Sequence, residues 1–112
     1  MKVLIIPEVR QYFYELEYIL YEKDYFSYYE NAERYVEELI EDIKNNLPAK
    51  HSKQAPDYFD KYGKNMEYAT FKKSKHTTWY VFFDTYKDNN EILYLVRHIE
   101  NNHTAAQHFD FR

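Results

Sequence analysis

Residues 77–84 have the sequence Thr77-Thr78-Trp79-Tyr80-Val81-Phe82-Phe83-Asp84, and residues 91–99 have the sequence Glu91-Ile92-Leu93-Tyr94-Leu95-Val96-Arg97-His98-Ile99. β-Branched and aromatic residues dominate both runs, which is typical of β-strands. Lys87-Asp88-Asn89-Asn90 lies between them and has the polar composition of a tight hairpin. Residues 66–73 also alternate in polarity, so we expect three consecutive antiparallel strands that form a meander.

The first part of the chain has the spacing of one short strand followed by two helices. Residues 2–6 are an apolar run that a proline interrupts, as expected of an N-terminal strand. Apolar residues then recur at helical spacing over residues 8–24 and again over residues 28–47. Ser27 and Glu30 have the spacing of a capping box, so we expect Ser27 to cap the second helix.

Residues 48–65 show no sustained period and contain two of the three prolines and the only glycine. They predict a connecting loop, with a helical turn after Pro56. The element order is then β-α-α-β-β-β, an α+β fold in which a helical hairpin packs on a small, mainly antiparallel, twisted sheet. We expect the N-terminal strand to join this sheet, the second sheet face to stay partly exposed, and residues 1–112 to form a single domain.

The composition argues against several classes of protein. A chain without cysteine has neither a disulfide scaffold nor a thiolate metal site. No apolar run approaches the length of a transmembrane helix, so we expect no membrane contact and a cytoplasmic location. The net charge of −4 argues against nucleic-acid binding driven by bulk charge, although lysines gather in the middle of the chain.

The element order resembles that of the RelE/ParE superfamily of toxins from bacterial type II toxin–antitoxin systems. The resemblance includes Trp79-Tyr80-Val81-Phe82-Phe83 and Leu95-Val96-Arg97-His98-Ile99-Glu100-Asn101-Asn102-His103, and it covers nearly the whole chain. It implies one of two activities: metal-free cleavage of messenger RNA in the ribosomal A site by an endoribonuclease, as in RelE-like members, or poisoning of DNA gyrase, as in ParE-like members. It also implies a cognate antitoxin, an extended segment of which wraps the toxin, and no cofactor.

Two neighbouring residues of the last strand, Arg97 and His98, are the candidate catalytic residues. Metal-free RNA cleavage needs a base, an acid and a cation beside the phosphate. His98 titrates near neutral pH, Arg97 can hold phosphate oxygens, and the resemblance places catalytic arginine or histidine in this strand. Because successive strand residues point to opposite faces, both side chains reach one site only where a bulge or the strand end breaks the alternation.

A basic turn between the first two strands of the meander is the candidate nucleic-acid contact. Its members are Lys72, Lys73, Lys75 and His76. We expect no metal site, since His98, His103 and His108 recur every five residues and share no helix or strand face.

Two other functions fit the sequence. A catalytically inactive relative with this fold would serve as a protein- or nucleic-acid-binding module. A stand-alone protein that binds single-stranded nucleic acid would stack bases on Tyr80, Phe82 and Tyr94 of an exposed sheet face.

Overall fold

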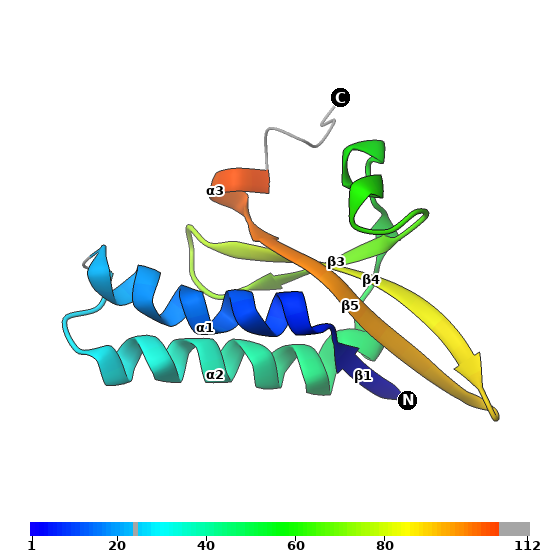
Figure 1. The fold of residues 1–112 in the computed structure, drawn as a ribbon, viewed down its shortest axis with the longest axis horizontal. Coiled ribbons are helices and arrows are strands. Elements are labelled where there is room, and N and C mark those ends of the chain that lie inside the picture. The colour runs from blue at the N-terminus through cyan, green and yellow to red at the C-terminus, as the bar shows by residue number, and fades with distance from the viewer. Residues whose placement is uncertain (24, 106–112) are drawn as a thin grey trace.

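The computed structural model describes residues 1–23 and 25–105, the side chains of residues 104 and 105 excepted. Figure 1 shows the arrangement of its elements. In chain order they are β1 (Lys2–Ile5), α1 (Pro7–Glu22), α2 (Tyr29–Asn46), η1 (Leu47–Ala49), β2 (Lys53–Gln54), η2 (Asp57–Lys61), β3 (Glu67–Lys72), β4 (Thr78–Asp88), β5 (Glu91–Asn101) and α3 (Asn102–Ala105). The α+β class, both long helices, the meander and the turn after Pro56 are thereby confirmed.

The sheet has five strands in the order β1-β5-β4-β3-β2, and β1 is parallel to β5 whereas the other pairs are antiparallel. Asn89 and Asn90 join β4 to β5 with φ angles of 48° and 70°, the left-handed pair of a type I′ hairpin turn. As predicted, the N-terminal strand joins this sheet, where it is the edge strand beside β5. The two-residue β2, which pairs with β3, was not expected from the sequence.

Both long helices cover one face of the sheet (Figure 1). Their apolar stripes supply Val9, Phe13 and Leu16 from α1 and Val36, Leu39 and Ile43 from α2. These side chains pack on the inward residues of the sheet, which are Ile5, Ala69, Phe71, Trp79, Val81, Phe83, Val96 and Ile99. The indole N–H of Trp79 donates a hydrogen bond of 2.9 Å to the Tyr35 hydroxyl, so the one polar atom of that ring is paired inside the core.

The opposite face of the sheet is partly covered by η2, which lies above the sheet in Figure 1. Phe59 of η2, Met66 and Phe82 form a second, smaller core that we call the outer cluster. The rings of Phe59 and Phe82 stack with their centroids 4.3 Å apart, and both side chains are fully buried. The sequence predicted a more exposed face, because a short 3-10 turn leaves no apolar period to detect.

The predicted capping box at Ser27 is wrong. Helix α2 begins at Tyr29, with Tyr28 at the N-cap position and no side-chain cap. Contacts with α1 fix this end instead, since the Tyr29 hydroxyl donates a hydrogen bond of 2.9 Å to Glu17 and its ring contacts those of Tyr18 and Tyr21. Tertiary packing therefore outweighs the local capping preference here.

Among the helices that the structure describes, none combines the length and the apolar character that crossing a bilayer requires.

Candidate functional site

A β-bulge in β5 brings the two predicted catalytic residues to the same side of the sheet. Phe82 pairs with His98 and Phe83 pairs with Val96, so Arg97 is an extra residue with no cross-strand register partner in β4. Val96 and Ile99 both point into the core beneath the helices. The bulge interrupts the strand alternation between Arg97 and His98. Both side chains therefore lie on the same face of the sheet, whereas in a regular strand they would point to opposite faces.

His98 is held by a carboxylate and by stacked aromatic rings. Its Nε2 lies 2.7 Å from Oε1 of Glu100, two residues further along the same strand. Its ring is nearly parallel to that of Tyr62, at 7°, with the two centroids 3.7 Å apart. Phe82 and Phe59 of the outer cluster lie 5.5 and 6.0 Å from the imidazole. Only 17% of the His98 side chain is exposed, so both its orientation and its solvation are restricted.

Arg97 points along the same face toward β4, where it is already paired. Its Nε donates to Oδ2 of Asp84 and its Nη2 donates to the Tyr86 hydroxyl at 2.9 Å. These two hydrogen bonds, that to Tyr86 first, raise the pKa of Arg97 above the ordinary value of an arginine. These bonds use two of the five N–H donors of the guanidinium, and the Asp84 carboxylate offsets the positive charge that would attract a phosphate.

Gly63 allows the Arg97 side chain to pass. A Cβ atom at residue 63 would lie 2.9 Å from Cδ of Arg97 and 3.0 Å from Sδ of Met66. The single glycine of the chain therefore stands where the segment after η2 crosses the bulge, and any larger residue would push against both side chains.

A pocket of about 550 Å³ opens beside His98, between β5, the start of α1 and the end of η2. Its polar and charged lining consists of Glu8, Tyr12, Lys61, Tyr62, Arg97, His98 and Glu100. Beyond Val96, which accepts a hydrogen bond from the Ile6 amide, β5 runs on past the end of β1 toward Asn101. The pocket follows this part of β5, beyond its pairing with β1.

Three side chains that line the pocket have shifted pKa values. Burial lowers the pKa of His98 below 6.5, an effect that Glu100 opposes and Lys61 reinforces. Burial also raises the pKa of Tyr12 to about 12, with Glu100 adding to the effect. The pKa of Lys61 is raised, chiefly by its hydrogen bond with Tyr58. At neutral pH the pocket therefore has a neutral imidazole, a lysine cation and a neutral phenol.

This arrangement suits proton transfer by His98. When the ring is neutral, its Nε2–H donates a hydrogen bond to Glu100, and the lone pair of the ring is then on Nδ1. A carboxylate in this position orients the imidazole and stabilises the imidazolium that forms when the ring takes up a proton. Arg97 and Lys61 are the two cations of the pocket lining. Arg97 forms an ion pair with Asp84, whereas Lys61 forms none with a carboxylate of the described residues.

The basic turn lies away from this pocket. Lys72, Lys73, Lys75 and His76 are absent from its lining, and Lys73 lies over the Tyr35 ring on the helix side, 5.5 Å from its centroid. The turn is tied to the end of β5, where Asn102 donates a hydrogen bond to the His76 carbonyl. Asn102 is four residues past His98, roughly 13 Å along a strand. The predicted nucleic-acid contacts and the predicted catalytic residues are therefore separate surfaces.

The proposed stacking platform of Tyr80, Phe82 and Tyr94 is wrong as an exposed surface. Phe82 is fully buried against Phe59, and Tyr94 packs against the core under the helices, where its ring contacts Phe83. Tyr80 is partly buried and packs against the outer cluster, to which Phe82 belongs.

Five polar residues of the pocket were not predicted as site residues from the sequence: Glu8, Tyr12, Lys61, Tyr62 and Glu100. They come from α1, η2 and β5, and no spacing along the chain brings these elements together. The sequence does contain one signal, since Tyr62 precedes the only glycine of the chain and a lone glycine often marks a close backbone approach.

Within the described residues, no three histidine, aspartate or glutamate side chains lie close enough together to hold a metal ion. His108 of the spaced histidines lies outside the described residues.

Comparison of the chain with models of known protein families, with curated proteins and with solved structures found no match.

Proposed function

We propose that this chain is the toxin component of a type II toxin–antitoxin system of the RelE/ParE kind, a metal-free endoribonuclease that acts on translation in the cytoplasm. The chief support is the placement of His98, whose imidazole is paired with Glu100 in an open pocket on the side to which the bulge also turns Arg97. The element order of the resemblance, a strand, two helices and an antiparallel meander, is a second support.

In this proposal His98 is the base that takes the proton of the attacking 2′-hydroxyl, and Glu100 orients the ring. The 2′-oxygen bonds to phosphorus as the bond from phosphorus to the 5′-oxygen breaks, which leaves a 2′,3′-cyclic phosphate, and solvent water donates the proton that the leaving 5′-oxygen takes up. Lys61 offsets the charge that develops on the phosphate, and Arg97 adds to this effect through the guanidinium donors that Asp84 and Tyr86 do not use. A neutral imidazole is the state that a base needs, and burial favours that state.

Induction of the chain alone in a bacterial host tests this function. We expect growth arrest with the natural sequence and restored growth with His98→Ala, and a smaller relief with Arg97→Ala. His51→Ala is the matched control, because His51 is exposed in the loop after η1. Full toxicity of both His98→Ala and Arg97→Ala would contradict the proposal, provided circular dichroism shows that the variants are folded.

The same cultures identify the target. New 5′ ends within messenger RNA indicate cleavage on the ribosome, whereas altered supercoiling of a reporter plasmid indicates DNA gyrase. Co-expression of the protein encoded by a neighbouring gene should restore growth and yield a stable complex if that protein is the antitoxin.

A catalytically inactive relative that binds protein or nucleic acid is the second candidate. The ion pair between Arg97 and Asp84 favours it, because the Asp84 carboxylate offsets the positive charge that would attract a phosphate to Arg97. Normal growth on induction, together with no growth effect of Asp84→Asn, would support the binding module over the nuclease.

A further inference from the structure

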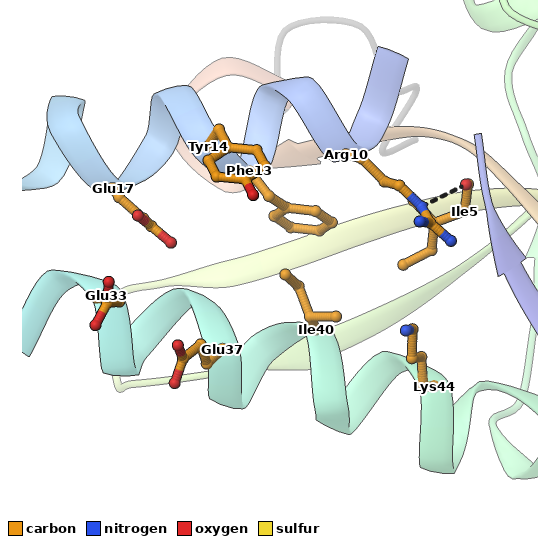
Figure 2. A pocket seen from close by; sticks show the side chains of 9 residues that line it. All are labelled: Ile5, Arg10, Phe13, Tyr14, Glu17, Glu33, Glu37, Ile40 and Lys44. Carbon is orange, nitrogen blue, oxygen red and sulfur yellow. Dashed lines mark hydrogen bonds between the residues drawn. The ribbon is translucent and has the colours of Figure 1, made fainter. Parts of the chain in front are cut away.

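A second pocket, distinct from that of His98, lies between α1 and α2. It is a groove of about 380 Å³ that is lined from both helices and from the end of β1 (Figure 2). Phe13 and Ile40 face each other across it, and Figure 2 shows the sheet behind them. Phe13 and Ile5 are almost fully buried and Ile40 is half-buried, so the floor of the groove is apolar.

The charges of the groove are separated by sign. Arg10 and Lys44 lie at the end next to β1, whereas Glu17, Glu33 and Glu37 lie toward the other end (Figure 2). Arg10 is fixed there by a hydrogen bond of 3.1 Å from its Nε to the Ile5 carbonyl. None of these five side chains forms an ion pair with any other part of the chain that the structure describes. The groove is therefore a dipolar surface whose charges are not offset by ion pairs in the described part of the chain, although one oxygen of Glu17 already accepts a hydrogen bond from the Tyr29 hydroxyl.

Tyrosine side chains extend the acidic end of the groove. Tyr14 lines it and is 67% exposed, and Tyr18 on the next turn of α1 is 57% exposed. Tyrosine is enriched where proteins bind one another, and its ring attracts lysine and arginine. Acidic residues beside exposed tyrosines fit a basic segment of a partner and disfavour a phosphate backbone.

We propose that this groove binds a helical segment of a partner protein. Both walls of the groove are helices whose backbone groups are already paired, so they offer no hydrogen bonds to an extended strand, whereas a third helix satisfies its own. From Glu33 to Lys44 is about 16 Å along a helix, or three turns. The partner helix has an apolar stripe, basic residues at the end over Glu17, Glu33 and Glu37, and acidic residues three turns away over Arg10 and Lys44. This surface goes beyond the proposed function, since it requires neither His98 nor RNA.

Three helix-stapled peptides with the same leucine stripe test the proposal. The dipolar peptide has lysines at one end and glutamates at the other, and the two uniform peptides have lysines or glutamates at both ends. We expect fluorescence anisotropy to show that the dipolar peptide binds roughly tenfold tighter than either uniform peptide, as two or three exposed ion pairs would give. This advantage should shrink with added salt, and NMR shifts should concentrate on α1 and α2.

Charge reversal on α2 provides the matched comparison. In Glu33→Lys with Glu37→Lys, four of the five charged residues that line the groove are basic and Glu17 is the remaining carboxylate, so the uniform glutamate peptide should become the tightest by a similar factor. Glu38→Lys with Glu41→Lys is the control, since both residues are exposed on α2 outside the groove. If charge reversal impairs folding, Glu33→Gln with Glu37→Gln should largely remove the preference for the dipolar peptide over the uniform glutamate peptide, while the preference over the uniform lysine peptide persists because Arg10 and Lys44 are unchanged.

Several outcomes would overturn the proposal. They are equal binding of the three peptides, an equal effect of the control variant, and NMR shifts that lie outside α1 and α2. Tighter binding of an unstapled, proline-containing peptide of the same composition would point to an extended segment. Self-association of the protein that Glu33→Lys with Glu37→Lys abolishes would assign the groove to a second copy of this chain.

Discussion

His98 combines a buried ring with a carboxylate partner, and this combination gives a prediction about its titration. Burial lowers its pKa below 6.5, while Glu100 and Lys61 act in opposite directions. NMR titration of the imidazole should show a pKa below 6.5 that falls further in Glu100→Gln and rises in Lys61→Met. A pKa unchanged by both substitutions would mean that neither side chain acts on the ring.

The same shift predicts how stability depends on pH. Between the folded-state pKa of His98 and 6.5, the unfolded chain binds more protons than the folded chain does. The contribution of His98 to the free energy of unfolding is therefore present above pH 6.5 and is lost as the pH falls through the folded-state pKa. Urea unfolding from pH 7.5 to pH 5 should show a steeper loss of stability for the natural sequence than for His98→Gln.

Gly63 gives a second prediction for a single residue. In Gly63→Ala, the new Cβ would press on Cδ of Arg97, which cannot swing away freely because Asp84 and Tyr86 hold its guanidinium. We expect Gly63→Ala to lower the free energy of unfolding by about 1–3 kcal/mol, the usual cost of overpacking. The cost should shrink when Arg97→Ala is added, as a double-mutant cycle would show. Lys64→Ala, at an exposed neighbour, is the control.

Among the elements, strand β5 gives a prediction through its bulge. Removal of Arg97 leaves Val96, His98 and Ile99 in regular alternation, with each residue still facing the side on which it now lies. The chain without Arg97 should therefore fold with the pairs Phe82–His98 and Phe83–Val96 intact, as cross-strand NOEs would show.

Deletion of Leu95 is the matched control. If the pairing on both sides of the deletion is kept, Val96 moves to the outer face and Arg97 moves into the core beneath the helices. Burial of an unpaired arginine should cost at least about 3 kcal/mol. Equal destabilisation by the two deletions would show that the bulge itself is required for folding.

The elements differ in how well the sequence predicted them. The two long helices have long apolar periods, and the β4–β5 turn has two asparagines, which favour its left-handed conformation. Local sequence preferences therefore define these elements. Segment 48–65 has no such period, and its role comes from one buried side chain, Phe59, that packs on a strand distant in the sequence. The sequence predicted Arg97 and His98 of β5 as site residues. Tyr62 and Lys61, which line the same pocket, belong to segment 48–65, and only the tertiary fold brings them to β5.

At the scale of the whole molecule, the sheet separates two cores of unequal size. The larger core lies under the helices, and the outer cluster of Phe59, Met66 and Phe82 lies under η2. Strand β4 contributes to both, since Val81 and Phe83 face the helices while Phe82 faces η2. The His98 site depends on the smaller core, because Tyr62, Lys61 and the Phe59 contact all come from that side.

Two substitutions of the same kind, on opposite faces of the sheet, separate these cores. Phe59 and Phe71 are both fully buried phenylalanines, the first in the outer cluster and the second beneath the helices. We expect both Phe59→Ala and Phe71→Ala to lower the free energy of unfolding by about 3–5 kcal/mol, by the loss of buried area and the cavity left behind. Only Phe59→Ala should raise the pKa of His98 toward 6.5, because only this change exposes the imidazole to water. It should also speed amide exchange over residues 55–66 while the β4–β5 pairs stay protected. Equal shifts of the His98 pKa in the two variants would mean that the sheet transmits the disturbance and that the two cores act as one.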